Sequence, residues 1–480
     1  MIRSLTAATS AALVLASLAH AEMPASYSHL IYARQNFAAN PGGAYNLPGN
    51  YFNSGDTPAL NDLGQVTFKL SVTTGAFQSI WFGEPNMGGT AAVGGIVYNS
   101  ANDAFLGSTS LNEQSRCVWD TTFTSQNGVY LYTRSSGVGG FFFNRPLGAS
   151  GWSSPQINNN GLVGFRANFA GSGQAWVNHN SMTNITSFHA SEVGVDSTSP
   201  YSFLFTPSFN NANQIAGKVR RGGAGQTGES QPDEIRVFNA DGSSILIAQD
   251  RDANPSSPYA RFDNSVSLRD DGWVAFTTNL FPFSAGGRAV VLSNGATSIT
   301  IAQTTAPGTQ VSNIESFAPA ANNNGLVAFR AFDTSNLRAV WVGDGTALMR
   351  IATEHDILPI DLGSARIDQN DSSPVFGGGV SINNNGDVAF NAALTPPENN
   401  QIEWGTGTFV ARAHFPVPAC PGDANGDRSV GLADIAMIIQ QWGQTVPVGT
   451  GGDVNADGAV GLPDIAVVIQ NWALECPPLR

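Results

Sequence analysis

Two twelve-residue segments near the C-terminus carry regularly spaced oxygen ligands. Each places Asp or Asn side chains at positions 1, 3, 5 and 12, and position 7 can add its backbone carbonyl. This is the spacing of a calcium-binding loop, and the absence of His and Cys from both segments favours a hard cation over zinc or copper. We therefore expect two Ca2+ ions, held by Asp423, Asn425, Asp427, Ser429 and Asp434 in the first loop and by Asp453, Asn455, Asp457, Ala459 and Asp464 in the second.

A single helix is expected after each loop, because apolar residues follow Asp434 and Asp464 with helical spacing. The two apolar series are Ile435, Ile438, Ile439 and Trp442, and Ile465, Val468, Ile469 and Trp472. Prolines before the first loop disfavour an entering helix there. Two loop–helix halves with Asp rather than Glu at position 12 resemble a type I dockerin. The resemblance implies that a cohesin-like protein captures this module in a calcium-dependent manner.

The module departs from the dockerin pattern at several positions. Arg428 stands where a Gly is expected at position 6, and Gly431 and Gly461 at position 9 offer no side-chain ligand, so water is expected there. Positions 10 and 11, which help dockerins choose their cohesin, are apolar. We expect these residues to contact the partner, with packing between the two helices as the alternative; they are Leu432, Ala433, Leu462 and Pro463.

The three cysteines divide into a pair and a single residue. Cys420 and Cys476 bracket the module and are expected to form a disulfide. Cys117 occupies a repeat position where other copies carry Val, so it is expected to be a buried small apolar residue rather than a reactive thiol.

The rest of the chain offers few residues for catalysis. It contains no His-x-x-x-His pair, Gly-x-Ser-x-Gly elbow or phosphate-binding loop. Two polar groups follow expected strands, and their carboxylates could in principle serve glycoside hydrolysis. The alternative is that both are solvated crossover loops; the candidate residues are Asp250, Asp252, Glu354, His355 and Asp356.

The elements that must position these side chains form a repeat. The segment Ile157-Asn-Asn-Asn-Gly-Leu-Val-Gly-Phe165 recurs from Ala321 and from Ile382, and weaker copies begin at Leu60, Leu111, Phe209 and Leu268. Each unit has an Asn- and Gly-rich turn that tolerates positive φ, a Val-x-Phe strand, and room for four strands in all. Seven such units predict an all-β, seven-bladed β-propeller. The repeat resembles secreted bacterial repeat proteins of no established activity.

The two ends of the repeat region indicate how the ring closes. The last unit passes into the C-terminal module after a third strand near Thr408–Arg412, whereas Ser28–Arg34 has the pattern of a fourth strand without a predecessor. Pairing these two segments would close the propeller. An open β-solenoid or a pair of β-sandwiches is the alternative architecture.

Composition limits the possible partners, and the N-terminus indicates an exported protein. Only 12% of residues are charged and the net charge is −14, which disfavours nucleic acid and anionic membranes as partners. The densest basic group, Lys218, Arg220 and Arg221, is expected on a solvated loop. Arg3, an apolar stretch and Ala19-His20-Ala21 predict a cleaved secretory signal over residues 1–21, with a retained N-terminal anchor as the alternative. We expect no transmembrane segment after the signal and a secreted or surface-attached product.

The sequence therefore predicts a propeller over residues 22–415 and a dockerin-like module over 416–480. The first functional hypothesis is a non-catalytic binding or scaffold protein, attached to a surface or assembly through its dockerin, whose propeller binds a protein or glycan. The alternative is a dockerin-borne carbohydrate-active enzyme that degrades polysaccharide. A convergent carboxylate pair in one propeller mouth would favour the enzyme, and a mouth lined with Ser, Asn and Phe would favour binding.

Overall fold

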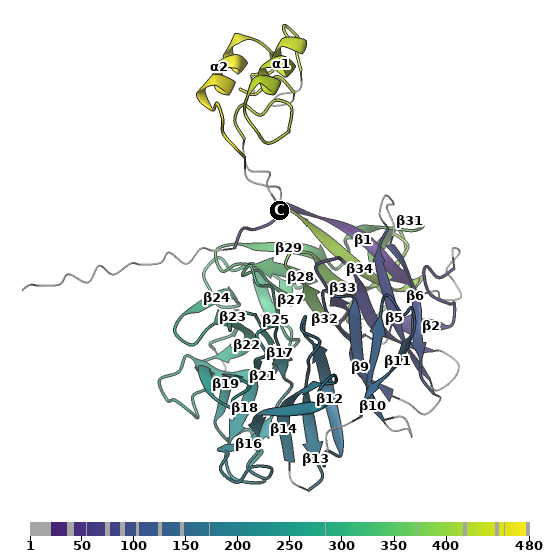
Figure 1. Ribbon diagram of the computed structural model, residues 1–480, viewed down its shortest axis with the longest axis vertical. Helices are drawn as coiled ribbons and strands as arrows, with labels where there is room; N and C mark the ends of the chain where they lie inside the picture. Colours follow the sequence, from purple (N-terminus) through teal and green to yellow (C-terminus); the bar gives the residue numbers. More distant parts are fainter. Residues whose placement is uncertain are drawn as a thin grey trace, which may run out of the picture. The chain divides into compact units, whose positions relative to one another are not determined.

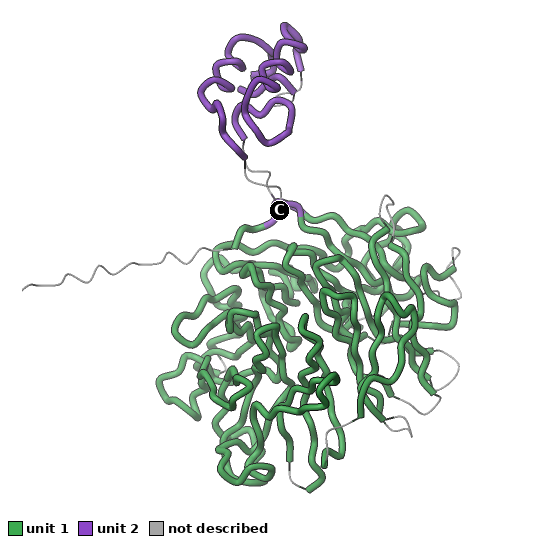
Figure 2. Tube along the Cα trace, viewed as in Figure 1, with its two compact units in different colours: residues 1–23, 27–413 green, residues 24–26, 414–480 purple. Residues whose placement is uncertain are grey.

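The computed structural model describes residues 21–476 apart from short internal segments: residues 36–42, 54, 73–76, 87–91, 102–104, 123–126, 145–147, 172, 284, 372, 416–419, 447–450 and 456. The predicted signal sequence lies outside the described residues except for Ala21. The described residues form two compact units, one built from residues 21–23 and 27–413 and the other from residues 24–26 and 414–476 (Figure 2). No helix among the described residues is long and apolar enough to span a bilayer.

The first unit is a ring of seven sheets, as Figure 1 shows, so the predicted all-β seven-bladed propeller is confirmed. Blade 1 contains β2 (Tyr51–Asn53), β3 (Ala59–Leu60), β4 (Val66–Val72), β5 (Gln78–Pro85) and β6 (Ala92–Asn99), and blade 2 contains β7 (Phe105–Leu106), β8 (Ser110–Leu111), β9 (Arg116–Thr122), β10 (Gly128–Thr133) and β11 (Gly139–Phe143). Blade 3 contains β12 (Gly151–Ile157), β13 (Val163–Phe169), β14 (Gly173–Asn180) and β15 (Ile185–Ser191). Blade 4 contains β16 (Tyr201–Leu204), β17 (Ser208–Phe209), β18 (Ile215–Arg221), β19 (Asp233–Phe238) and β20 (Ser244–Gln249).

Blades 5 to 7 repeat this antiparallel arrangement. Blade 5 contains β21 (Tyr259–Leu268), β22 (Val274–Leu280), β23 (Arg288–Ser293) and β24 (Ser298–Gln303). Blade 6 contains β25 (Val311–Ile314), β26 (Ala320–Ala321), β27 (Val327–Asp333), β28 (Arg338–Gly343) and β29 (Leu348–Thr353). Blade 7 contains β30 (Ile357–Ile360), β31 (Gly363–Ile367), β32 (Phe376–Ile382), β33 (Val388–Thr395), β34 (Gly405–His414) and β1 (Ser26–Arg34).

The innermost strand of most blades is broken or bulged halfway along. Pro58, Pro155, Pro207 and Pro319 lie at four of these interruptions. Because proline has no N–H to donate, it interrupts the ladder to the second strand. The chain then resumes pairing in a short segment that leads directly into the Asn-rich turn.

The apolar faces of the blades are buried against one another. The first residue of each Val-x-Phe strand, such as Val163, Val274 or Val327, is fully buried, and Cys117 occupies the same place in blade 2. The expectation that Cys117 is buried is therefore confirmed. Each core cluster combines residues of two neighbouring blades, as where Ala275 of blade 5 packs with Phe329 of blade 6. No blade has a complete core of its own, so the ring must be closed to bury all of them.

The N-terminal strand closes the ring, as predicted. β1 is the outermost strand of blade 7 and pairs with β34, which continues into the C-terminal unit (Figure 1). At its end, the fully buried Arg34 guanidinium donates from Nε (2.9 Å) and from Nη2 (2.7 Å) to the Asp361 carboxylate. This bidentate bond joins the first strand of the chain to the turn between β30 and β31 of the same blade.

The Asn-rich turns form a first ring of hydrogen bonds between blades. In six blades the first turn residue is an Asn whose Nδ2 donates to the backbone carbonyl of the same position in the next blade, at 2.9–3.3 Å, and blade 5 has Arg269 instead. The six are Asn61, Asn112, Asn158, Asn210, Asn322 and Asn383. Their Oδ1 atoms accept backbone N–H groups of their own turns, so each side chain both shapes its turn and joins two blades.

A second ring lies one residue further along each turn. Here the backbone N–H of the second turn residue donates to the side-chain oxygen of the second turn residue in the next blade. The shortest such bond between each two neighbouring blades measures 2.6–3.0 Å. The circle runs through Asp62, Glu113, Asn159, Asn211, Asp270, Asn323 and Asn384 and returns to Asp62. All seven blades are thus joined by one continuous series of hydrogen bonds.

Removing one first-ring side chain should destabilise the propeller. Asn322→Ala loses the amide bond to the Asn383 carbonyl and two acceptor bonds within its turn, and it leaves buried groups without partners. We expect a loss of about 2–4 kcal/mol in the free energy of unfolding. The control Asn324→Ala removes an exposed amide with one interblade bond and should cost less than about 1 kcal/mol. Urea unfolding followed by tryptophan fluorescence measures both, and equal stabilities of the two variants would contradict the ring's role.

Candidate functional site

The C-terminal unit consists of two matching loop–helix halves. Each loop leads into a single helix, as predicted: α1 (Leu432–Gln440) begins at position 10 of the first loop and α2 (Leu462–Gln470) at position 10 of the second. The fully buried Asp434 carboxylate accepts backbone N–H groups of Ala424 (2.8 Å), Asn425 (3.2 Å) and Gly431 (2.7 Å). Asp464, equally buried, accepts from Asn455 and Gly461. The last residue of each loop therefore ties the loop's start to its helix.

Position 6 is Arg428 in the first loop and Gly458 in the second, but the backbone is arranged alike at both. The N–H of Arg428 donates to Asp423 (3.0 Å), as that of Gly458 donates to Asp453 (2.8 Å). Both residues have positive φ, 72° for Arg428 and 84° for Gly458. Because a side chain disfavours this conformation by about 1–2 kcal/mol, the first loop is formed at a cost that the second avoids.

The donor set fits a calcium ion. Within the described residues, Asp423, Asp427 and Asp434 form no ion pair with Lys or Arg, although Asp434 is fully buried. Burying an ionised carboxylate without a cationic partner is costly, and backbone N–H bonds offset only part of this cost. A bound divalent cation would neutralise the loop carboxylates, with Asp423, Asn425, Asp427, Ser429 and Asp434 as its ligands and the equivalent residues in the second loop.

Each half completes the loop of the other. Val430 of the first loop exchanges backbone hydrogen bonds with Ala473 and Leu474 after α2, and Val460 of the second loop pairs in the same way with the residues after α1. Ile438 and Val468 are fully buried in the shared core. The Cys420–Cys476 disulfide is present, with Cα atoms 5.8 Å apart, and joins the beginning and end of the unit.

The four expected partner contacts are exposed. Leu432 is 74% and Leu462 69% exposed, and Ala433 and Pro463 also face solvent. The helical periodicity did not show that the apolar series divides into two faces. Ile438 and Val468 are buried, whereas four residues of the same series are about half exposed or more: Ile439, Trp442, Ile469 and Trp472. With the leucines they form one exposed apolar stripe per half, defined as Leu432, Ile439 and Trp442 and as Leu462, Ile469 and Trp472.

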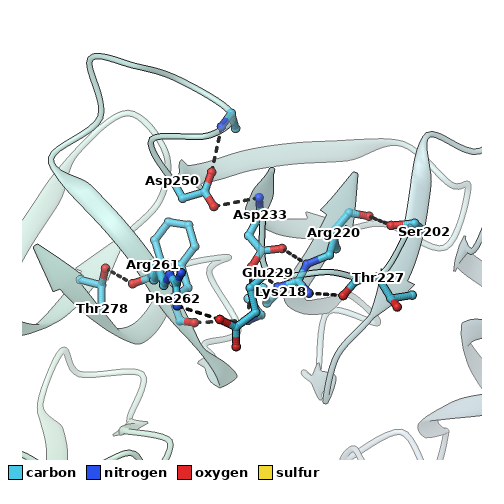
Figure 3. Close-up of polar contacts among 11 residues, drawn as sticks. Ser202, Lys218, Arg220, Thr227, Glu229, Asp233, Asp250, Arg261, Phe262 and Thr278 are labelled. Atoms are coloured by element: carbon cyan, nitrogen blue, oxygen red, sulfur yellow. Dashed lines mark hydrogen bonds and ion pairs between the residues drawn. The ribbon is translucent and has the colours of Figure 1, made fainter. Parts of the chain in front are cut away.

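Asp250, a catalytic candidate, lies in a buried charge cluster at the end of blade 4 (Figure 3). Its side chain is 2% exposed and accepts backbone N–H groups of Asp233 (3.0 Å) and Ala253 (2.9 Å), so it shapes the turn that leaves β20. Burial raises the pKa of Asp250 to about 6. Arg220 holds the neighbouring Asp233 carboxylate with two bonds of 2.7 and 2.8 Å.

The expectation of a solvated loop for Lys218 and Arg220 is wrong. Both lie on β18 and are only 4% and 7% exposed, while the Arg221 side chain is about half exposed. Lys218 Nζ lies 3.4 Å from the Asp233 carboxylate and donates to the Phe262 carbonyl of the next blade (Figure 3). The Asp233 carboxylate, 15 residues after Lys218 and 13 after Arg220, supplies a counter-charge that offsets part of the cost of burying both cations.

The other acidic group lies at the crossing from blade 6 to blade 7. Glu354 accepts the N–H of Arg338 (3.2 Å), Asp356 accepts that of Thr353 (2.7 Å), and His355 Nε2 lies 3.7 Å from Asp368. Asp252 is exposed beside Asp250. No hydrogen bond or ion pair among the described residues joins the Asp250–Asp252 group to the Glu354–Asp356 group. The carboxylates of Asp250, Glu354 and Asp356 instead accept backbone N–H groups near their own turns.

The channel through the propeller contains at least two cavities, each lined by residues of all seven blades. One, of about 190 Å3, is lined by the first and second rings and by the apolar residues before them. Its carboxylates are Asp62, Glu113 and Asp270, and burial together with the charge of Asp62 raises the pKa of Glu113 to about 7. The second cavity, of about 510 Å3, is lined by the innermost strands of all seven blades.

Two family models match the sequence. A family of unknown function (DUF7453) matches residues 157–413, and the dockerin type I domain matches residues 421–472. The second match confirms the identification of this module as a type I dockerin. Type I dockerin domains bind calcium in general. No curated protein matches the chain.

Several solved structures resemble parts of this chain at low identity. TolB from Acinetobacter baumannii is 13% identical, with a TM-score of 0.39 over 60% of this chain and 64% of that one. An oligogalacturonate lyase in complex with manganese is 9% identical, with a TM-score of 0.49 over 82% and 98%. The β-propeller domain of the Trilobed protease from Pyrococcus furiosus is 8% identical, with a TM-score of 0.48 over 75% and 95%. These likenesses carry no information about activity.

Calcium should order the C-terminal unit selectively. With the loop carboxylates neutralised, the free energy of binding adds to that of folding. Hydrogen exchange of the full chain, followed by mass spectrometry, should show stronger protection of residues 420–476 in calcium than in chelator, with the propeller unchanged. The double variant Asp434→Asn/Asp464→Asn should lose this difference, and Asp371→Asn, at an exposed propeller turn, should retain it. Equal protection of the wild-type unit in calcium and chelator would show that the loops bind no calcium.

Proposed function

The chain belongs to the family of unknown function DUF7453 and ends in a type I dockerin domain, and we propose that it is an exported, non-catalytic binding protein held at a cell surface or in a multiprotein assembly by a cohesin-like receptor. The observation that carries this proposal is the pair of exposed apolar stripes beside the calcium loops. A receptor that covers one stripe would bury large apolar side chains, which commonly supply most of the binding energy of an interface.

The loop geometry supports calcium-dependent capture. Leu432 and Leu462 immediately follow the glycines whose N–H groups Asp434 and Asp464 hold. Ordering the two carboxylates with two calcium ions would therefore fix the start of each stripe. Because the two halves are related by near repetition, either stripe can present the same chemistry to a receptor.

The export and binding parts of the proposal have separate support. The predicted signal over residues 1–21 indicates export, and the Cys420–Cys476 disulfide is typical of an oxidising compartment. The catalytic candidates give no support for an enzyme, because Asp250 caps a turn and the Glu354–Asp356 group has its own partners. The propeller is therefore assigned to ligand binding, to a glycan or protein.

Cohesin capture can be tested with purified type I cohesin domains and the full chain. We expect binding in calcium that disappears in chelator. Single variants Leu432→Ala and Leu462→Ala should weaken binding by less than about threefold, because the other stripe remains, and the double variant by at least about tenfold. Leu246→Ala, at an exposed propeller leucine, is the matched control. Binding that persists in chelator, or that the double variant retains, would contradict the proposal.

A further inference from the structure

The larger channel cavity is lined by neutral hydroxyl groups. Its volume of about 510 Å3 lies within the range of small-molecule sites, roughly 300–1,000 Å3. Every blade contributes at least one Ser or Thr to the lining, and no lining residue is charged. We call this cavity the hydroxyl chamber.

Several of these hydroxyls are fixed in place by a neighbouring blade. Ser208 Oγ accepts the N–H of Leu268 (3.0 Å), Ser267 Oγ accepts that of Ala321 (3.0 Å), and Thr57 Oγ1 accepts that of Gly379 (2.8 Å). A hydroxyl that accepts a backbone bond still has its O–H proton to donate. Ser208, Ser267 and Thr57 therefore present positioned donors. Thr109 and Ser381 already donate to backbone carbonyls, at 3.1 and 2.6 Å, so a ligand in the chamber must offer oxygen acceptors to the first three hydroxyls.

Charged groups behind the chamber wall are already paired. Lys218 lies beside Asp233, Arg330 pairs with Glu315 (2.7 Å), and Lys69 pairs with Asp56 (2.8 Å). Each of these cations also donates to a backbone carbonyl of the next blade. An anionic or cationic ligand would lose its hydration in the chamber without gaining an unpaired counter-charge, so the lining favours a neutral ligand.

Apolar surfaces alternate with the hydroxyls. Proline rings such as Pro155 and Pro207, together with Val266 and Val380, complete the wall, and Phe317 stands at 39% exposure with Arg330 4.2 Å from its ring centre. A purely apolar ligand would leave the hydroxyl donors without acceptors. A neutral sugar has both hydroxyl oxygens and C–H faces, so it matches both parts of the lining.

We propose that the hydroxyl chamber is a binding site for a neutral carbohydrate of one or two sugar units. This inference rests on the proposed function in one respect, the assignment of ligand binding to the propeller. Its ligand class is defined by the lining alone: oxygen acceptors for the hydroxyls, C–H faces for the prolines and valines, and no net charge.

Calorimetric titration of the full chain in calcium tests the site. The probes are the neutral disaccharides cellobiose, maltose and xylobiose, with digalacturonate as the charged comparison. We expect at least one neutral disaccharide to bind with a Kd of about 1 mM or lower and digalacturonate to bind at least tenfold more weakly. If no neutral probe binds at about 10 mM, or if digalacturonate binds as well as the best of them, the chamber does not select neutral sugars and the proposal is overturned.

Two variants of the lining and one control variant locate the binding. Ser265→Tyr fills the chamber and should abolish binding, whereas Ser256→Tyr, the same change on the exposed crossover of blade 5, should leave it unchanged. Thr206→Val keeps the side-chain volume but removes one lining hydroxyl, and should weaken binding about 2- to 10-fold without loss of thermal stability. Sugar binding that survives Ser265→Tyr would place the site elsewhere and contradict the proposal.

Cohesin binding of the same variants separates this proposal from the attachment function. Ser265→Tyr and Thr206→Val lie in the propeller and should bind cohesin as the wild type does. Intact cohesin binding without sugar binding in the wild-type chain would overturn only the chamber assignment. Sugar binding without cohesin binding would overturn only the attachment.

Discussion

The propeller depends on hydrogen bonds that each turn makes to the next blade in addition to those within its own. In the second ring, seven backbone N–H groups donate to seven neighbouring side-chain oxygens, and the series returns from Asn384 to Asp62. The core clusters have the same character, because each combines residues of two blades. A blade without its neighbours would have neither a complete core nor a satisfied turn. The closing pair of β1 and β34 is therefore required by every other blade.

This arrangement also determines what the channel can bind. The turn side chains direct their polar groups around the circle, and the basic residues of the second strands direct theirs to carbonyls of the next blade. Charges are used in holding the ring together, and short hydroxyl side chains are left to line the larger cavity. The C-terminal unit repeats the principle on a small scale, since each loop is completed by residues after the other helix.

Local patterns in the sequence predicted the elements but not all of their contacts. Repetition predicted seven blades, and the oxygen spacing predicted the two loops and their helices. The turn glycines indicated positive φ, which Gly161 and Gly325 adopt, but nothing local showed that Asn158 would reach the next blade. The local sequence suggests a loop for Lys218 and Arg220, because their partner Asp233 lies beyond an intervening segment. Helical periodicity marked Ile438 and Ile439 alike, although only Ile438 is buried.

The second ring can be measured directly through its backbone amides. Hydrogen exchange of the full chain resolves peptides that contain the turns at Glu113, Asn159, Asn323 and Asn384. If the ring holds the blades together, these turn amides exchange as slowly as those of the neighbouring strands, because each N–H is bonded across a blade boundary. Exchange as fast as at the exposed outer turn of Asp241-Gly242 would contradict the account, since the blades would then be held by their apolar faces alone.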